Sequence, residues 1–297
     1  MSETVSRLTV KAPAKLNLYL AVKDRRPDGF HNLESVFLAL DFGDTLHFEL
    51  FPGQKTTDIV MEGLNFTLPK EKNIIFKALS LFREKTGLCE GLKIRVEKRI
   101  PSGGGLGGGS SDAASTLLAL NCLAGFPLDC GSLFEMAASL GSDVPFFIYE
   151  TAAARVSGRG ECIEPVEAPR CFFVLVNPGF SSDTAAAFRL LDEYRRVNGV
   201  TRSETVTDTL FNDFLPVFKD PEKSAYNEII STLKELGAYS ANLSGAGSTC
   251  FGVFKERDGA EKAAAYLRNF GKWSFVECAC VDNTDNTHNM SACFNRV

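Results

Sequence analysis

A glycine-dense segment near the middle of the chain constrains its fold more than any other feature. From Pro101 to Ala113 the sequence is Pro-Ser-Gly-Gly-Gly-Leu-Gly-Gly-Gly-Ser-Ser-Asp-Ala, in which six of seven successive residues are glycine. A backbone with so few side chains can adopt positive φ angles and bring its N–H groups close to a ligand. A helix-favouring run, residues 113–124, follows, and the free N–H groups and dipole of a helix start attract anions. The segment therefore predicts a phosphate-binding loop that leads into a helix.

The surroundings of this segment argue against the commoner interpretation of a glycine-rich run as a flexible linker. Leu92, Ile94 and Val96 alternate with polar residues ahead of the glycines, as in a half-buried strand. A strand, a glycine turn and a helix in this order form a folded unit.

Two widespread phosphate loops do not match the segment. A Walker A loop needs a Lys after its glycines, and none is present. Gly103, Gly105 and Gly108 satisfy G-x-G-x-x-G, but so dense a run matches that pattern by chance. A dinucleotide-binding fold would also need a second buried strand that ends in an acid, whereas Pro127 and Asp129 mark a turn.

Composition and charge exclude several classes of protein. The 297 residues suit one large domain or two modest ones, and 44% hydrophobic with 23% charged residues is ordinary for a globular protein. The 32 Lys and Arg against 37 Asp and Glu give a net charge of −5, which argues against nucleic acid as a partner. No apolar run is long enough for a membrane span, and the N-terminus lacks the apolar core of a secretory signal. Nine cysteines without a disulfide framework agree with a cytoplasmic protein.

Hydrophobic periodicity predicts a first block of mixed strands and helices. Strands are expected at 8–10, 16–22, 45–51 and 92–100, and a helix at 73–85. Ser132 and Glu135 form a capping box, which predicts a helix from Ser132 to Leu140. The apolar run 144–149 has the length of a strand.

A second block begins near Arg170. Its order of strand, helices, hairpin, helix and strand predicts a ferredoxin-like α/β sandwich. The expected elements are a strand at 172–176, a helix that includes 185–194, a helix at 225–236, a hairpin turn at 244–248, a strand at 249–254, a helix at 260–270 and a strand at 274–281.

The glycine segment resembles the phosphate loop of the GHMP small-molecule kinases. Residues 12–18, Ala-Pro-Ala-Lys-Leu-Asn-Leu, resemble the first motif of that family, and residues 243–250 resemble its third motif. The resemblance implies a two-domain α+β fold with the active site in the cleft between the domains. The N-terminal domain, residues 1–168, would be of ribosomal-protein-S5-like type, and the C-terminal domain, residues 169–297, would be the ferredoxin-like sandwich.

One branch of the family matches more closely than the others. Residues 26–37 resemble its R-x-D-G-Y-H-x-L-x-[ST]-[VL]-F segment, and residues 40–44 and 141–147 also resemble segments of that branch. The branch uses ATP and Mg²⁺ to phosphorylate the 2-hydroxyl of a small molecule that carries cytidine diphosphate, in the non-mevalonate route to isoprenoid precursors. This implies a monomeric or homodimeric kinase. The alternatives are a GHMP kinase of homoserine or mevalonate type, or a non-catalytic nucleotide sensor on the same fold.

The resemblance assigns the chemistry to a lysine and an aspartate. Asp143 matches the catalytic Asp that takes the proton of the substrate hydroxyl, and Lys15 matches the Lys that pairs with it and offsets charge in the transition state. Strand alternation places Lys15 and Asn17 on one side, so Asn17 would bind the substrate or the pair. Outside the family pattern, Lys15 would be an ordinary solvated lysine. Asp143 would then close a helix at the end where the dipole disfavours a carboxylate.

The phosphates of ATP are assigned to the glycine loop and the helix start. Ser110 or Ser111 would cap the helix, meet phosphate or Mg²⁺, or do both. The residues expected to bind ATP are Pro101, Gly103, Gly104, Gly105, Leu106, Gly107, Gly108, Gly109, Ser110, Ser111, Asn73 and Lys98.

The cytidine is assigned to Phe30, which would stack on the base, and to His31, which would bond its edge. The branch usually has Tyr where this chain has Phe30, so stacking is kept and the hydroxyl is lost. A surface-loop role for His31 and a core role for Phe188 remain as alternatives. The residues expected to bind the substrate are Asn17, Phe30, His31, Thr184, Phe188, Gly245 and Gly247. No residue between 198 and 221 is assigned, because Asn212-Asp213 matches a family element only in part.

Overall fold

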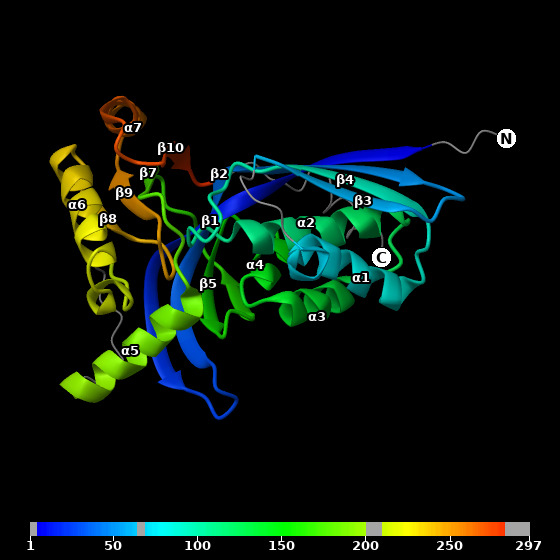
Figure 1. The fold of residues 1–297 in the computed structure, drawn as a ribbon, viewed down its shortest axis with the longest axis horizontal. Coiled ribbons are helices and arrows are strands. Elements are labelled where there is room, and N and C mark those ends of the chain that lie inside the picture. The colour runs from blue at the N-terminus through cyan, green and yellow to red at the C-terminus, as the bar shows by residue number, and fades with distance from the viewer. Residues whose placement is uncertain (1–4, 64–68, 200–209, 283–297) are drawn as a thin grey trace.

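The computed structural model describes residues 5–63, 69–199 and 210–282. These residues form a six-stranded sheet in the first half of the chain and a four-stranded sheet in the second half (Figure 1). The last strand of the first sheet ends at Pro165, and the first strand of the second sheet begins at Phe172.

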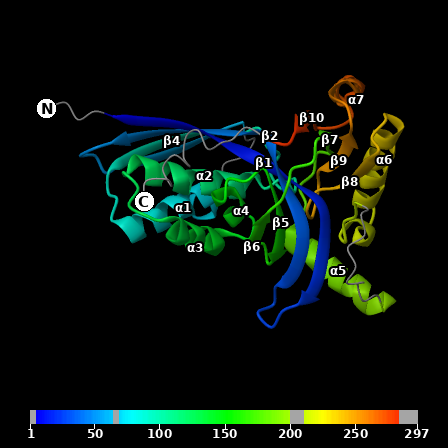
Figure 2. The same ribbon diagram turned by 180° about the vertical axis from the view of Figure 1, so that it is seen from behind.

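A hairpin of two long strands runs through much of the molecule (Figures 1 and 2). Its strands, β1 (Ser6–Arg25) and β2 (His31–Phe51), pair antiparallel. The register shifts between Pro13 and Lys15, and again after Asn17, as it does at β-bulges. Because the bulges do not interrupt the strand, the segments expected at 8–10 and 16–22 belong to one continuous strand.

Two of the other strands of this sheet pair with the free edge of β2. Since β1 occupies one edge, β4 and β5 both pair with the other edge, and β3 and β6 extend the sheet outward. These strands are β3 (Thr57–Glu62), β4 (Gly91–Glu97), β5 (Ala153–Gly158) and β6 (Cys162–Pro165).

Helices pack on one face of the first sheet, with α2 against β1 (Figure 1). Apolar residues of these helices and of β1, β2 and β4 form one core. The helices are η1 (Lys70–Lys72), α1 (Ile74–Thr86), α2 (Gly108–Leu123), α3 (Cys130–Leu140) and α4 (Val144–Ile148).

Helix α3 begins two residues earlier than the sequence predicted, and the apolar run 144–149 forms a helix although its length is that of a strand. Asp129 caps α3, because its side chain accepts a hydrogen bond from the N–H of Ser132 at 2.8 Å, and the helix begins at Cys130. Within the apolar run 144–149, residues Val144–Ile148 form α4. Pro145 lies in its first turn, where a missing N–H costs nothing, and all five residues of α4 are buried. A run that is buried all round carries no alternation, so its length alone was a poor guide.

The second sheet has the strand order β10-β7-β9-β8, with every pair antiparallel. This order and the sequence of elements are those of the predicted ferredoxin-like sandwich. The elements are β7 (Phe172–Asn177), α5 (Thr184–Asn198), η2 (Leu215–Val217), α6 (Glu222–Glu235), β8 (Ser240–Leu243), β9 (Cys250–Phe254), α7 (Arg257–Phe270) and β10 (Phe275–Cys280).

Strand β7 shows how the two sheets are joined. Val174 and Val176 face a core that includes residues of α6 and α7, whereas Phe173 and Leu175 share a core with Leu38 of β2. Alternate residues of a strand point to opposite faces, so one face of the second sheet packs on its helices and the other on the β1–β2 hairpin. The two halves are therefore joined through a common apolar core.

Helix α5 lies apart from α6 and α7, beside the turn of the β1–β2 hairpin (Figures 1 and 2). Arg195 on this helix donates a hydrogen bond to the carbonyl oxygen of Val22 at 2.6 Å. The contact brings side chains of α5 next to the hairpin segment that carries Phe30 and His31.

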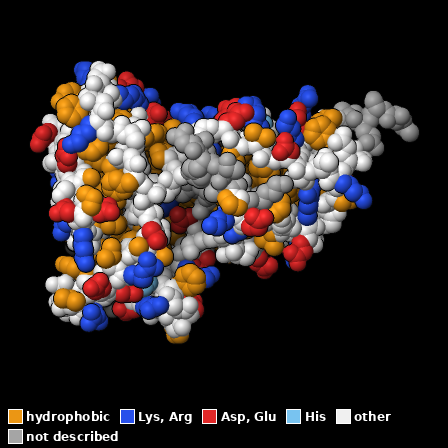
Figure 3. Space-filling model, in the orientation of Figure 1, with side chains coloured by type: hydrophobic (Ala, Val, Ile, Leu, Met, Phe, Trp, Pro, Cys, Tyr) orange, Lys and Arg blue, Asp and Glu red, His pale blue; other side chains and the backbone are white. Residues whose placement is uncertain are grey.

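Charged side chains of both signs are mixed over the face shown in Figure 3, without a large patch of one sign. Within the described residues, no helix is long and apolar enough to cross a membrane.

Candidate active site

A cleft of about 1010 Å³ is lined by residues from both halves of the chain. Its walls come from β1, the glycine loop, the starts of α1 and α4, the hairpin turn before β2, α5, and the turn between β8 and β9. The candidate residues from the sequence meet here, although two of them, Lys15 and Gly245, are 230 positions apart in the chain.

The glycine loop presents an uncapped helix start to this cleft. Helix α2 begins at Gly108, five residues earlier than predicted, and its N-cap is Gly107, which offers no side-chain hydrogen bond. The first intrahelical bond found is that from the Ser111 N–H to the Gly107 carbonyl, at 2.9 Å. The N–H groups of the first turn before Ser111 are thus left for a ligand, which makes this helix start an anion site. Neither Ser110 nor Ser111 is the N-cap.

The glycines also serve close packing inside the protein. A Cβ on Gly105 would lie 2.2 Å from the Ser244 carbonyl oxygen, and a Cβ on Gly107 would lie 2.7 Å from Cγ of Lys15. Both residues have positive φ, 75° and 71°. The glycine loop therefore packs between residues 243–250 on one side and Lys15 on the other.

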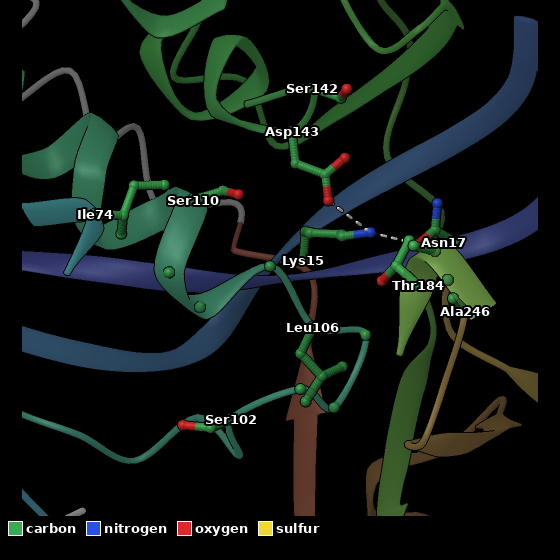
Figure 4. Close-up of a pocket in the computed structure, with 18 of the residues that line it drawn as sticks. Lys15, Asn17, Ile74, Ser102, Leu106, Ser110, Ser142, Asp143, Thr184 and Ala246 are labelled. Carbon is green, nitrogen blue, oxygen red and sulfur yellow. Dashed lines mark hydrogen bonds and ion pairs between the residues drawn. The ribbon is translucent and has the colours of Figure 1, made fainter. Parts of the chain in front are cut away.

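Lys15 and Asp143 form an ion pair in the cleft, with Nζ 3.1 Å from Oδ2. Figure 4 shows the ammonium group of Lys15 directed between Asp143 and Asn17. The Asn17 Oδ1 lies 2.5 Å from Nζ, and the ring centroid of Phe37 lies 4.6 Å away. The backbone N–H of Lys15 donates to the carbonyl of Leu106 at 2.8 Å, so the strand is tied to the glycine loop at this point.

Asn17 is fixed by the residues behind it. Its Nδ2 donates to Ser35 Oγ at 3.0 Å, and Ser35 Oγ donates to the Tyr19 carbonyl. Its backbone N–H lies 3.4 Å from Ser244 Oγ, which itself donates to the Gly105 carbonyl at 3.0 Å. The contact between Lys15 Nζ and Asn17 Oδ1 confirms that these two side chains share one side of β1.

Asp143 stands at a helix start, not at a helix end. Gly141 closes α3, and Asp143 is the N-cap residue of α4 without making a side-chain cap bond. Its carboxylate turns to Lys15 instead, and the side chain keeps 28% of its surface exposed. The prediction that a helix dipole disfavours this carboxylate is therefore wrong.

A buried charge cluster lies under the loop. The ammonium of Lys98 contacts Asp44 and, at 2.6 Å, Asp112. Burial lowers the pKa of Lys98, but the two carboxylates raise it further, and the net direction is upward. Burial together with the nearby Asp44 raises the pKa of Asp112 to about 7, against the pull of Lys98. Asp44 is held by the backbone N–H groups of Arg99 and Ile100 at 2.5 and 2.9 Å.

Asn73, which was predicted to bind ATP, also caps a helix. Its Oδ1 accepts a hydrogen bond from the Ile75 N–H at 3.0 Å and caps α1. Asn73 and Lys98 both line the cleft in addition to making these structural contacts.

The hairpin turn and α5 form the far end of the cleft. Phe30 is 52% exposed, and the guanidinium of Arg159 lies 4.9 Å from its ring centroid. His31 is buried and its ring stacks on Phe188 of α5. Thr184 lies at the first residue of the same helix. Phe188 is thus both a packing residue and part of the cleft wall.

The predicted site residues line the cleft, with two exceptions. Ser111 is fully buried, and its Oγ has no hydrogen-bond partner within the part of the chain that the structure describes. Gly247 lies behind the loop, where its carbonyl oxygen would be 2.9 Å from a Cβ on Gly105. These two residues shape the loop from behind and do not face the cleft.

Several residues of the site were missed by the sequence analysis. Asp44, Arg159 and Asp192 touch the predicted residues Lys98, Phe30 and His31. Asp44 lies in the matched segment 40–44 but was given no role, and Arg159 and Asp192 belong to no motif. Asn212 is buried and donates from Nδ2 to the carbonyls of Leu243 and Gly245, both at 2.8 Å. The partial Asn212-Asp213 match was the one signal that could have found it.

Two protein-family models match this chain, one in each half. Residues 73–151 match the model of the GHMP kinases N terminal domain, and residues 215–272 match that of the GHMP kinases C terminal. A 4-diphosphocytidyl-2-C-methyl-D-erythritol kinase from Xanthomonas axonopodis pv. citri is 38% identical over 260 residues, 86% of this chain and 85% of the relative. The protein of the same name from Thermodesulfovibrio yellowstonii is 36% identical over 280 residues, 89% of this chain and 95% of the relative.

Solved structures with a similar fold include a kinase of the same name. A crystal structure of 4-(cytidine 5'-diphospho)-2C-methyl-D-erythritol kinase is 31% identical, covers 92% of this chain and 99% of its own, and has a TM-score of 0.72. A homoserine kinase from Cytophaga hutchinsonii, 16% identical with a TM-score of 0.66, covers 93% of this chain and 95% of its own and shares the fold. The two-domain fold predicted from the sequence is confirmed.

Proposed function

The chain belongs to the GHMP kinases and, within them, to the family of 4-diphosphocytidyl-2-C-methyl-D-erythritol kinases, and on this premise we propose its reaction. It is an ATP-dependent small-molecule kinase. It transfers the γ-phosphoryl group of ATP to the 2-hydroxyl of 4-diphosphocytidyl-2-C-methyl-D-erythritol, on the non-mevalonate route to isoprenoid precursors. The observation that carries the proposal is the Lys15–Asp143 ion pair, 3.1 Å long, in the same cleft as the uncapped start of α2.

In the proposed reaction, the hydroxyl oxygen attacks the γ-phosphorus while the bond to the β,γ-bridging oxygen breaks and ADP leaves. Asp143 accepts the hydroxyl proton, a role that suits a carboxylate open to the cleft. Lys15 orients the hydroxyl and offsets the negative charge of the transition state, for which its nearly buried ammonium is well placed. Asn17 holds the ammonium in position through its 2.5 Å contact.

The phosphates of ATP are proposed to bind the N–H groups at the start of α2 and in the glycine loop. Mg²⁺, when bound with ATP, would neutralise phosphate charge, and it commonly takes only one or two protein ligands. Ser110 suits this role, because its side chain lines the cleft at the first turn of α2. The described residues contain no cluster of three or more His, Cys, Asp or Glu that could hold a metal ion.

The cytidine end of the substrate is proposed to lie between the hairpin turn and α5. Phe30 offers an exposed ring, with the guanidinium of Arg159 over it, and His31 lies beside Phe188.

Residues 1–168 and 169–297 are proposed as the two domains, a division that falls between β6 and β7.

A substrate comparison tests this function. The purified protein is assayed for ADP release with Mg²⁺ and ATP, using 4-diphosphocytidyl-2-C-methyl-D-erythritol, methylerythritol phosphate without cytidine, homoserine or mevalonate. The first compound should be the efficient acceptor. Equal rates with the compound lacking cytidine, or a preference for homoserine or mevalonate, would point to another GHMP kinase. ATP binding without turnover on any of them would point to a nucleotide sensor.

A further inference from the structure

His31 is held in the cleft by two side chains of α5. Its Nε2 lies 2.8 Å from Oδ1 of Asp192, and its ring stacks on Phe188 with centroids 5.0 Å apart and 16° between the planes. Phe188 packs edge-on against Phe214 at 4.9 Å, which keeps the stack in place. The side chain of His31 is only 6% exposed. The imidazole therefore has one orientation, with its Nε2 edge committed to Asp192.

This contact decides where the imidazole carries its proton. An ionised carboxylate can only accept a hydrogen bond, so Nε2 of His31 must be the donor to Asp192. A neutral imidazole has one N–H, and Nδ1 is then a lone-pair acceptor. Among the described residues Nδ1 has no hydrogen-bond partner, and His31 lines the cleft. Asp192 likewise has no other ion-pair or hydrogen-bond partner in the described part of the chain.

Resting on the function proposed above, we infer that Asp192 is a positioning residue that makes Nδ1 of His31 an acceptor and so selects cytosine over uracil. Cytosine carries an amino group at C4, which donates to an acceptor, whereas uracil carries a carbonyl oxygen there. A fixed Nδ1 lone pair accepts a hydrogen bond from the amino group of cytosine and is repelled by the carbonyl oxygen of uracil. The uracil complex would leave two acceptors facing each other beside the buried imidazole, which lowers kcat/KM about 10- to 100-fold.

The alternative is that Asp192 is only a solvated acid on an exposed helix. Its neighbour Glu193 is such a residue, because it is exposed and does not line the cleft. Glu193→Gln removes the same charge from the same helix turn and serves as the matched control. Asp192→Asn keeps the size of the side chain, but its amide can donate as well as accept, so it no longer fixes the imidazole proton. Asp192→Glu keeps an acceptor-only group.

The kinetic test compares the cytidine substrate with its uridine analogue in the full-length protein. Asp192→Asn should raise KM for the cytidine substrate about tenfold, leave kcat within twofold, and lower the cytidine-to-uridine ratio of kcat/KM about tenfold. Asp192→Glu should recover most of the selectivity, and Glu193→Gln should match the wild type. A wild-type enzyme that does not discriminate, or an Asp192→Asn ratio equal to the wild-type ratio, overturns the inference.

Nuclear magnetic resonance reads the imidazole proton directly and independently of turnover. The chain has three histidines, so a long-range ¹H–¹⁵N spectrum of the substrate-free protein is simple, and His31→Gln assigns the signal. The inference predicts an Nε2–H form in the wild type and a mixture in Asp192→Asn. An Nδ1–H form in the wild type overturns it even if the cytidine substrate is phosphorylated. If the Nε2–H form is found but neither the cytidine substrate nor its uridine analogue reacts, the proposed function is contradicted. The inferred selectivity for cytosine is then contradicted as well, because it depends on that function.

Discussion

Replacing Gly107 with alanine tests whether the glycine loop sets the position of Lys15. A Cβ at this residue would lie 2.7 Å from Cγ of Lys15 and 3.2 Å from Cζ of Phe147, on a backbone with φ of 71°. Two carbon atoms in contact need about 3.5–4.0 Å, so the stem of Lys15 must move by about 1 Å. A shift of that size in a group that aligns the reactants costs about 100-fold in kcat. The positive φ adds about 1–2 kcal/mol of lost stability, and the overlap adds about 1–3 kcal/mol.

Gly125→Ala is the matched control for this prediction. Gly125 has a similar φ of 77°, but a Cβ there would meet nothing within 4 Å. It should lose about 1–2 kcal/mol of stability through its backbone alone and keep wild-type kcat. Urea unfolding and steady-state kinetics at saturating substrate separate the two effects. If Gly107→Ala keeps kcat within threefold of Gly125→Ala, the loop does not set the position of Lys15.

Burial raises the pKa of Glu150 from its ordinary 4.5 to about 7. The folded protein then binds this proton more tightly than the unfolded chain, so stability falls as pH rises from about 4.5 to about 7. Glu150→Gln should remove about 1–2 kcal/mol of that fall between pH 5 and pH 8, allowing for partial exposure, and an unchanged pH dependence of urea unfolding would refute this. Asn212→Ala leaves the buried carbonyls of Leu243 and Gly245 without their donor, which should cost about 2–3 kcal/mol and raise substrate KM. The exposed Asn198→Ala should change neither quantity, and equal effects of the two variants would contradict the role of Asn212.

The sequence predicted the parts of the site whose chemistry is local in the chain. A strand, a glycine run and a helix lie within residues 92–124, so their order alone indicates a phosphate loop. Alternation along β1 predicted that Lys15 and Asn17 share one side, and their 2.5 Å contact confirms it. The second sheet was predicted because its strands and helices have clear periodicity and short connections.

Other features depend on contacts that a single sequence does not display. Asp44 and Asp112 lie 68 positions apart and are brought together only by Lys98 between them. Asp192 reaches His31 across 161 positions. The apolar run that forms α4 was described by its length alone, because burial on all sides removes the periodicity that separates a helix from a strand. The start of α2 was placed too late, because glycines are poor helix formers and the tertiary packing of the loop overrides that preference.

The turnover of Asp143→Asn, measured alongside its affinity for ATP, tests the central claim most directly. The substitution keeps the size of the side chain and removes the proton acceptor beside Lys15. ATP should still bind with a Kd within about threefold of the wild-type value, because its phosphates contact the start of α2, while kcat falls about 100- to 10,000-fold. A variant with wild-type kcat would show that the proton leaves by another route and that the Lys15–Asp143 pair is not the catalytic centre.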